Sequence, residues 1–304
     1  YKEGEMRIEI ENIGKIRRAD VDLSTVAVLA GENNSGKSTV GKVLYSIARA
    51  MDECVDLGAK LSEDFEEVLR FEADKGSVKM EGDMVCDLQV EDDGKIHSGD
   101  FSKGDFNFIY IDDPNILDFK VGASYLPEFL NSRRLDLLNM LAKSNGQGFD
   151  SERINALVDG DLIIRGDQFF YSKNEGLSMH NTSSGLKMFL ILKTLLAKGW
   201  VGHKSVLIFD EPEVHLHPEW QLVFAKTCID LVKKYQVRIL LNTHSPYLVE
   251  AFEVYSAKEK LNAKFYLTEN SEDYADIVDV TKDIDLIYKG LAEPFSKLEA
   301  EAYE

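Results

Sequence analysis

The sequence predicts an α/β protein with a mostly parallel sheet flanked by helices, and two observations support this prediction. Runs of apolar and β-branched residues at 25–30, 205–209 and 237–241 have the composition of strands that are buried on both faces. Segments with helical spacing of apolar residues lie between and around these runs, with short connections, at 40–52, 184–198, 219–234 and from 246 onward. Such alternation is typical of parallel strands joined by helices.

An N-terminal antiparallel β lobe is predicted by segments with a period of two. Residues 6–13 alternate apolar and charged side chains, Gly14 turns the chain, and 19–23 form a second short strand. Residues 77–93 alternate as well, with turn residues at Gly82 and at 92–94, and 106–111 form a buried strand. A short amphipathic helix is expected at 61–71.

The middle of the chain predicts a helical and hairpin insertion. A helix is expected over 127–142, a polar mobile loop over 143–148, and a hairpin over 162–171 that turns at 165–168. We therefore predict a single domain over 1–304. Its parts are an N-terminal lobe at 6–120, the insertion at 121–180 and a second lobe at 181–304.

Composition limits the function classes. The 304 residues are 44% hydrophobic and 29% charged, as in ordinary globular proteins. No apolar run reaches the ~18 residues of a membrane span, and residues 1–5 lack a signal peptide, which predicts a cytoplasmic protein. We expect Met6 to be the native start and residues 1–5 a cloning remnant. The formal net charge of −19 disfavours a surface that tracks DNA.

The three cysteines, Cys54, Cys86 and Cys228, are scattered and show no CxxC spacing. Such a set predicts buried thiols in a reducing cytosol rather than a disulfide framework or a zinc site. Two small basic clusters, 15–18 and 133–134, are expected to be solvated or salt-bridged rather than to bind nucleic acid.

The stretch 31–39 predicts a nucleotide-phosphate site, because it fits G-x-x-x-x-G-K-[ST] between a strand and a helix. Its glycines let successive amides face an anion at a helix N-terminus. Lys37 can reach the β/γ-phosphates and the Ser38 hydroxyl can bind Mg²⁺. The alternative is a Gly/Asn/Ser turn with a surface lysine, which the flanking strand and helix disfavour. The predicted ligands are Asn33, Asn34, Ser35, Gly36, Lys37, Ser38 and Thr39.

A second stretch, 206–212, delivers two carboxylates at the end of a buried strand, where ligands lie in open α/β sheets. Asp210 is placed to hold Mg²⁺, directly or through water. Glu211 can reach a water beyond the γ-phosphate and act as general base. The alternative is an acidic turn, which the presence of the phosphate loop disfavours.

Two further stretches add candidate contacts. His244 ends another buried strand and can sense a γ-phosphate, although a lone histidine is more often structural. Ser183, Ser184 and Gly185 precede a helix and can form a second anion site, which suggests a contact with nucleotide held by another subunit; Ser-Ser-Gly is equally a good N-cap. His215 and His217 lie two apart with no further His/Cys cluster, so we favour a structural role over metal binding.

With these four stretches in order, the chain resembles the ABC-type ATPase heads of SMC-like, RecF-like and OLD-type proteins. It is most similar to the bacterial AAA-family group, which looks like the ATPase part of OLD and PtuA defence proteins. Residues 31–39 match Walker A, 182–186 stand where L-S-G-G-Q would be, and 210–213 with 216–218 and 243–246 match Walker B and the histidine segment.

The resemblance implies two heads that face each other with two ATP molecules between them. Lys37 and Ser38 would bind phosphate and Mg²⁺, Asp210 would support Mg²⁺, and Glu211 would be the base. His244 would be the γ-phosphate switch, and Ser183 with Gly185 would contact the ATP of the other head. Ser184 and Leu186 replace the second glycine and the glutamine of the signature, and Asp112 and Asp113 stand where a Q-loop glutamine is expected.

We therefore expect a Mg²⁺-dependent ATPase that dimerises, or forms a higher even oligomer, and regulates a separate effector such as a nuclease or toxin in a bacterial anti-phage module. The spacing between the motifs leaves no room for long coiled-coil arms, and the chain stops too soon after His244 for the Toprim domain of OLD proteins. The main alternative is a DNA-repair or chromosome-maintenance ATPase that acts on DNA directly. A transporter nucleotide-binding subunit and a non-hydrolysing ATP-bound scaffold are further alternatives.

Overall fold

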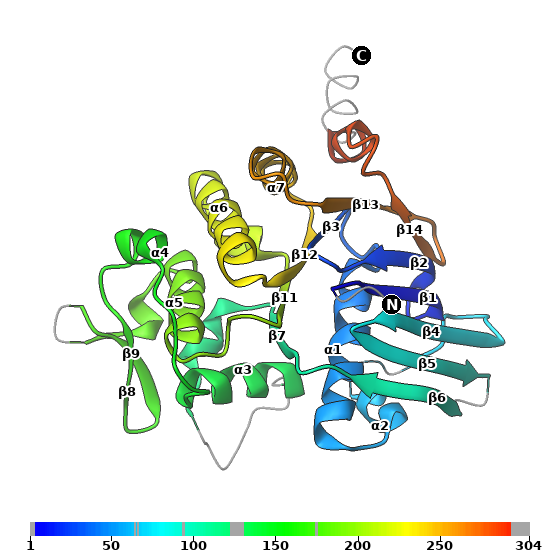
Figure 1. Cartoon of the computed structure of the whole chain (residues 1–304), viewed down its shortest axis with the longest axis horizontal. Coiled ribbons are helices and arrows are strands. Elements are labelled where there is room, and N and C mark those ends of the chain that lie inside the picture. The colour runs from blue at the N-terminus through cyan, green and yellow to red at the C-terminus, as the bar shows by residue number, and fades with distance from the viewer. Residues whose placement is uncertain are drawn as a thin grey trace.

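The computed structural model describes residues 4–63, 65, 67–92, 95–121, 131–173 and 176–292. Its centre is an eleven-stranded sheet with the order β6-β5-β4-β1-β2-β14-β13-β3-β12-β11-β7 (Figure 1). The predicted sheet flanked by helices is confirmed. The predicted antiparallel lobe is continuous with it, so both parts form one mixed sheet.

The strand that leads into the phosphate loop lies between two parallel neighbours in the sheet. Strand β3 (Val26–Ala30) pairs in parallel with β12 (Arg238–Thr243) on one side and β13 (Ala263–Asn270) on the other. Beyond β12 follow β11 (Ser205–Asp210) and the edge strand β7 (Asn107–Ile111), both parallel. Because the strands are parallel, their carboxyl ends meet at one edge of the sheet.

The antiparallel part holds the N-terminal hairpin and a meander. Strand β14 (Ala275–Asp279) runs antiparallel to β13 and parallel to β2, and so connects the two parts of the sheet. The remaining strands all pair antiparallel: β1 (Met6–Ile13), β2 (Ile16–Asp22), β4 (Lys75–Gly82), β5 (Met84–Glu91) and β6 (Ile96–Lys103). Strands over 6–13 and 77–93 were predicted, whereas β6, β13 and β14 were not.

Helices cover both faces of the sheet around β3, which explains why this strand is apolar throughout. Val26, Val28 and Ala30 face a core that is shared with the helices α5 (Ser184–Ala197), α6 (Pro218–Tyr235) and α7 (Pro246–Lys258). Ala27 and Leu29 face a second core, which is built on α1 (Lys37–Glu53) and α2 (Leu57–Ser62). Figure 1 shows these two groups of helices on opposite sides of the strands.

The middle of the chain forms the helices and the hairpin that the sequence predicts. Helix α3 (Ser132–Ala142) begins after Asn131, whose side chain accepts a hydrogen bond from the Arg134 amide; 127–130 lie outside the described residues. Residues 143–148 contain no helix or strand. A small antiparallel sheet contains the predicted hairpin, and short helices flank it: β8 (Leu162–Arg165), β9 (Gln168–Tyr171), β10 (Leu177–Ser178), α4 (Glu152–Leu157), η1 (Pro114–Asp118) and η2 (Met179–Asn181).

Two predictions from the sequence are wrong. The helix expected at 61–71 ends with α2 at Ser62, because the following backbone bonds instead to the β1–β2 turn. The Gly14 amide donates to Val68 O and the Arg70 amide to Asn12 O, each within 3 Å. Cys86 and Cys228 are buried as expected, but Cys54 is exposed because it caps the C-terminus of α1.

No helix within the described ranges is long and apolar enough to span a membrane.

Candidate functional site

The loop between β3 and α1 forms a backbone cradle at a helix N-terminus. Gly36 is the N-cap of α1 with φ 82°, and Asn34 has φ 56°. These two residues in the left-handed region bend the loop over the first amides of the helix. Ser35 Oγ lies 2.7 Å from Thr268 Oγ1, and Thr268 donates to Ala30 O at 3.2 Å. Strand β13 therefore braces the loop from the side, a contact that the sequence did not predict.

Lys37 is buried inside this loop, with 2% of its side chain exposed. Its ammonium donates to Gly31 O at 3.0 Å and to Glu32 O at 2.5 Å, and it lies 3.7 Å from Glu211 Oε1. Desolvation lowers the pKa of Lys37, and the nearby carboxylate of Glu211 opposes that shift. The structure thus concentrates a poorly solvated positive charge where the sequence predicted a phosphate contact.

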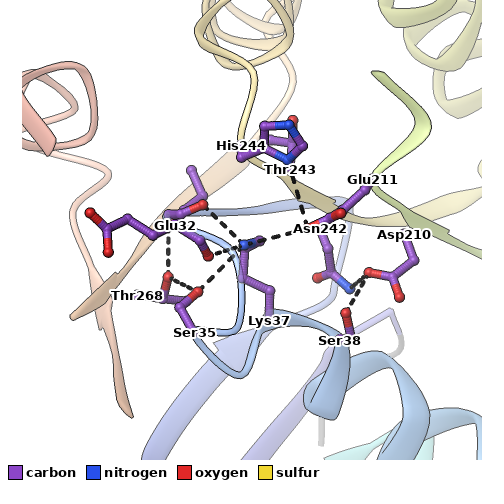
Figure 2. Close-up of polar contacts among 12 residues, drawn as sticks. Glu32, Ser35, Lys37, Ser38, Asp210, Glu211, Asn242, Thr243, His244 and Thr268 are labelled. Atoms are coloured by element: carbon purple, nitrogen blue, oxygen red, sulfur yellow. Dashed lines mark hydrogen bonds and ion pairs between the residues drawn. The ribbon is translucent and has the colours of Figure 1, made fainter. Parts of the chain in front are cut away.

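Asp210 lies at the end of β11, opposite Asn242 in the register of β12. Its Oδ1 accepts hydrogen bonds from Ser38 Oγ at 2.8 Å and from Asn242 Nδ2 at 3.0 Å (Figure 2). Its Oδ2 accepts a bond from the Tyr110 hydroxyl at 2.8 Å. The two predicted metal ligands, Ser38 and Asp210, are therefore in direct contact. Two of these partners, Asn242 and Tyr110, were not identified from the sequence.

Glu211 adopts a left-handed backbone conformation (φ 50°, ψ 49°), which is strained for a residue with a side chain. The Glu211 amide donates to Asn242 O at 2.9 Å, which holds this turn against β12. The carboxylate lies 3.7 Å from Lys37 Nζ and 3.7 Å from His244 Nδ1. His244 and then Lys37 lower the pKa of Glu211 against the effect of burial, so this carboxylate is ionised at neutral pH.

A second carboxylate, that of Glu213, bonds to the backbone at His244 and lies close to its ring, and it was not identified from the sequence. Glu213 lies in the short helix η3 (Pro212–His215) and is 7% exposed. Its Oε1 accepts bonds from the His244 amide at 2.6 Å and from Thr243 Oγ1 at 2.7 Å, and it lies 3.2 Å from His244 Nδ1. Glu211, and after it Glu213, raise the pKa of His244. The spacing of Glu213 two residues after Glu211 was the signal that could have identified it.

The predicted second anion site, residues 183–185, lies at the N-terminus of α5. Ser183 is the N-cap, and its side chain accepts a bond from the Leu186 amide at 3.4 Å. Gly185 packs closely on the next elements, because a Cβ there would lie 3.0 Å from His215 O and 3.2 Å from Trp220 Cε3. Ser183 and Gly185 therefore contact residues of α5, η3 and α6. The phosphate loop lies on other elements, between β3 and α1.

The two basic clusters and His215 lie close to carboxylates of neighbouring segments. Arg134 bonds to Asp112 at 3.1 Å, and Arg17 forms an ion pair with Asp276, so both basic clusters of the sequence include salt-bridged residues. His215 Nε2 lies 3.9 Å from Asp113 Oδ1, and His217 is the N-cap of α6. No group of three or more His, Cys, Asp or Glu residues capable of holding a metal occurs in the portion of the chain that the structure describes.

The donor chemistry fits Mg²⁺ at Ser38 and Asp210. A hydroxyl and a carboxylate are hard oxygen ligands, and Mg²⁺ in proteins is commonly bound by one or two carboxylates, water and substrate phosphates. Both oxygens lie beside the helix N-terminus that would receive the phosphates.

Comparisons with known proteins agree with this site at the level of the domain. Residues 113–249 match the family model described as AAA ATPase domain, a range that contains Asp210, Glu211 and His244. Protein ea59 of Escherichia phage lambda is 31% identical over 120 residues, which cover 40% of this chain and 22% of that protein.

Solved structures agree at the level of the fold. An SMC head bound to the C-winged helix domain of ScpA superposes with a TM-score of 0.59 at 12% identity, over 93% of this chain and 99% of the other. The recombination mediator protein RecF gives a TM-score of 0.50 at 11% identity, over 90% of this chain and 99% of the other. The chain therefore has the α/β P-loop ATPase fold found in SMC heads and RecF, and its family match points to ATP hydrolysis.

Proposed function

We propose that this chain is a Mg²⁺-dependent ATPase of the SMC/RecF-like type that acts as a switch for a partner protein. The observation that carries the proposal is the convergence of Lys37, Ser38, Asp210, Glu211 and His244 at one edge of the sheet (Figure 2). Lys37 and Ser38 begin α1, which follows β3, and the other three residues lie at or just after the ends of β11 and β12. The three strands β3, β12 and β11 are adjacent and parallel. Phosphate binding, Mg²⁺ binding and proton removal from the attacking water all need side chains at this one place.

Each residue has a distinct part in the reaction. The cradle at 33–39 and the Lys37 ammonium would hold the phosphates of ATP, and Ser38 with Asp210 would hold Mg²⁺. The ion, when bound, supplies positive charge that offsets charge developing on the phosphates. Glu211 would take the proton of the attacking water, which requires the ionised carboxylate that its lowered pKa provides. His244, beside Glu211, would contact the γ-phosphate.

The active unit in this proposal is a pair of chains. Ser183, Ser184 and Gly185 would contact ATP that is held by the phosphate loop of the other chain. This is supported by their place at the N-terminus of α5, on an element separate from β3 and α1. The N-cap bond of Ser183 leaves that role open, since the amides of the first helical turn can still face an anion.

The partner would be a separate effector, a nuclease or toxin in a bacterial anti-phage module. One solved structure with this fold is an SMC head bound to a domain of another protein, which supports a head that engages partners. The net charge of −19 supports a protein partner over DNA. Hydrolysis would open the pair of heads and release or activate the effector.

The test combines particle size by light scattering, with and without ATP and Mg²⁺, with phosphate release. Wild type, Glu211→Gln and the control Glu91→Gln are compared; Glu91 lies at the end of β5 in the antiparallel part. We expect Glu211→Gln to bind ATP, dimerise and release no phosphate, while Glu91→Gln behaves as wild type. The proposal would be contradicted if Glu211→Gln hydrolysed ATP at the wild-type rate and its particle size did not change when ATP was added.

A further inference from the structure

The carboxylate of Asp210 is fixed by donors on both of its oxygens. Ser38 and Asn242 bond to Oδ1, and the Tyr110 hydroxyl bonds to Oδ2 at 2.8 Å. Tyr110 comes from β7, which pairs in parallel with β11, and it lies opposite Ile208 in the register. A phenol that faces a carboxylate acts as the donor, so this bond constrains the rotation of the Asp210 side chain about its last torsion.

The ring of Tyr110 is itself held from several sides. It is 2% exposed and packs edge-on against Tyr45, with ring centroids 5.9 Å apart and an interplanar angle of 76°. The Arg133 guanidinium carbon of α3 lies 5.0 Å from the ring centroid. Helix α1 approaches closely because position 41 is a glycine: a Cβ there would lie 3.2 Å from Tyr110 Cε2. The hydroxyl is therefore presented to Asp210 by a ring with little freedom to move.

We propose that Tyr110 is a positioning residue for the magnesium site, which acts by holding Asp210 Oδ2 so that Oδ1 stays turned toward Ser38. The inference rests on the proposed function, because it needs Mg²⁺ to bind at Ser38 and Asp210. Partners that orient a metal-binding carboxylate typically change metal affinity or activity 10–100-fold when they are removed. Without the phenol, Asp210 would be held through one oxygen only, and the ion would meet a less ordered ligand.

Tyr45 provides a matched control inside the same cluster. It is also 2% exposed, and its hydroxyl donates to Asp136 Oδ2 at 2.8 Å, the distance of the Tyr110 bond. Both Tyr110→Phe and Tyr45→Phe remove one buried hydroxyl that donates to a carboxylate, and both keep the ring. Only Tyr110→Phe removes a bond to Asp210.

The measurement is the affinity of the protein for a fluorescent ATP analogue as Mg²⁺ is added, from which the Mg²⁺ concentration for the half-maximal increase in affinity is read. The affinity is also measured in EDTA, and a thermal melt is recorded for each variant. We expect Tyr110→Phe to need about tenfold more Mg²⁺, with the affinity in EDTA unchanged. Tyr45→Phe should match wild type in both quantities. In an Asp210→Asn background, Tyr110→Phe should add nothing to the Mg²⁺ requirement, because the two residues act through the same ligand.

The outcomes separate this inference from the proposed function. A wild-type protein whose ATP binding ignores Mg²⁺ would refute the proposed function and, with it, this inference. A Mg²⁺-dependent wild type with Tyr110→Phe equal to Tyr45→Phe would overturn only the inference. It would also be overturned if Tyr110→Phe shifted the Mg²⁺ requirement equally in the Asp210→Asn background, or if Tyr110→Phe lost cooperative melting, since the hydroxyl would then serve the fold.

Discussion

Glu213 Oε1 accepts a hydrogen bond from the backbone amide of His244 at 2.6 Å and lies 3.2 Å from the ring Nδ1 of the same residue. This carboxylate oxygen therefore fixes the backbone turn that ends β12, and it lies close to the imidazole that follows the turn. A histidine whose Nδ1 faces a carboxylate carries its proton there, which leaves Nε2 for another partner. This relationship makes Glu213 an orienting group for the proposed γ-phosphate contact.

Replacing Glu213 by Ala should reduce both stability and the pKa of His244. The His244 amide and the Thr243 hydroxyl would lose their acceptor in a buried place, at a cost of about 2 kcal/mol or more. Chemical denaturation measures the first effect, and an NMR titration of His244 measures the second. Glu250→Ala, at an exposed position of α7, is the control and should change neither. An unchanged pKa of His244 would show that Glu213 does not act on the ring.

The ion pair of Glu211 with His244 should make stability depend on pH at both ends. The pKa of Glu211 is lowered, chiefly by His244, so its contribution is present above the ordinary glutamate pKa of about 4.3 and is lost as pH falls through the folded-state value. The pKa of His244 is raised, chiefly by Glu211. Its contribution is full below a pH of about 6.5 and is lost as pH rises through the raised value.

Thermal melts of wild type and Glu211→Gln across pH 4 to 9 test this window. The melting temperature of the wild type should exceed that of Glu211→Gln most at intermediate pH, and this difference should shrink at both extremes of pH. The loss of melting temperature in His244→Gln should depend on pH in the same way as the loss in Glu211→Gln. The double variant should lose little more than either single variant. A difference that stays constant with pH would mean that the two side chains are not coupled.

Lys37→Met should separate stability from function. Burial lowers the pKa of Lys37, which means that the folded state holds this charge at a cost. A methionine of similar length removes that cost, so we expect the melting temperature to rise by about 2 °C while ATP binding is lost. Lys226→Met, at an exposed position of α6, should leave ATP binding intact. A Lys37→Met protein that still binds ATP would rule out the assigned phosphate contact.

Gly31→Ala should damage the cradle through a residue far away in the sequence. An added Cβ would lie 1.9 Å from Thr268 Oγ1, the atom that bonds to Ser35 Oγ and Ala30 O. We expect a loss of about 2 kcal/mol or more, since neither the loop nor β13 can move freely. Thr268→Ala removes the clashing oxygen, so the double variant should be more stable than Gly31→Ala alone. If Thr268→Ala gave no rescue, the strain would lie in the loop backbone instead.

The residues of the site that stand at the ends of strands could be predicted from the sequence. Asp210, Glu211 and His244 each follow an apolar run, and parallel strands bring such positions to one edge of a sheet. Lys37 and Ser38 belong to a motif whose geometry is local. The register between Asp210 and Asn242 follows only from the pairing of β11 with β12, which no spacing along the chain reveals.

The contacts that brace the site could not be predicted because they join distant segments. Thr268 and Tyr110 are an ordinary threonine and tyrosine in strands, and their roles depend on which strand lies beside which. The segment after Ser62 was assigned a helix from its apolar spacing, yet its amides and carbonyls bond to the turn at Asn12 and Gly14. Tertiary hydrogen bonds there outweighed a local preference.

The proposed contact across two chains predicts complementation between two inactive variants. Lys37→Met removes the phosphate contact, and Ser184→Arg places a bulky cation at the half-buried first position of α5. If each ATP is held by the phosphate loop of one chain and residues 183–185 of the other, a mixed pair has one site with both defects and one intact site. Equal mixing should then restore about a quarter of wild-type phosphate release, since half of the pairs are mixed and half of their sites work. Each variant alone should stay inactive, and both should melt cooperatively. If 183–185 instead acted on the ATP of their own chain, every site in the mixture would carry one defect and no activity would return.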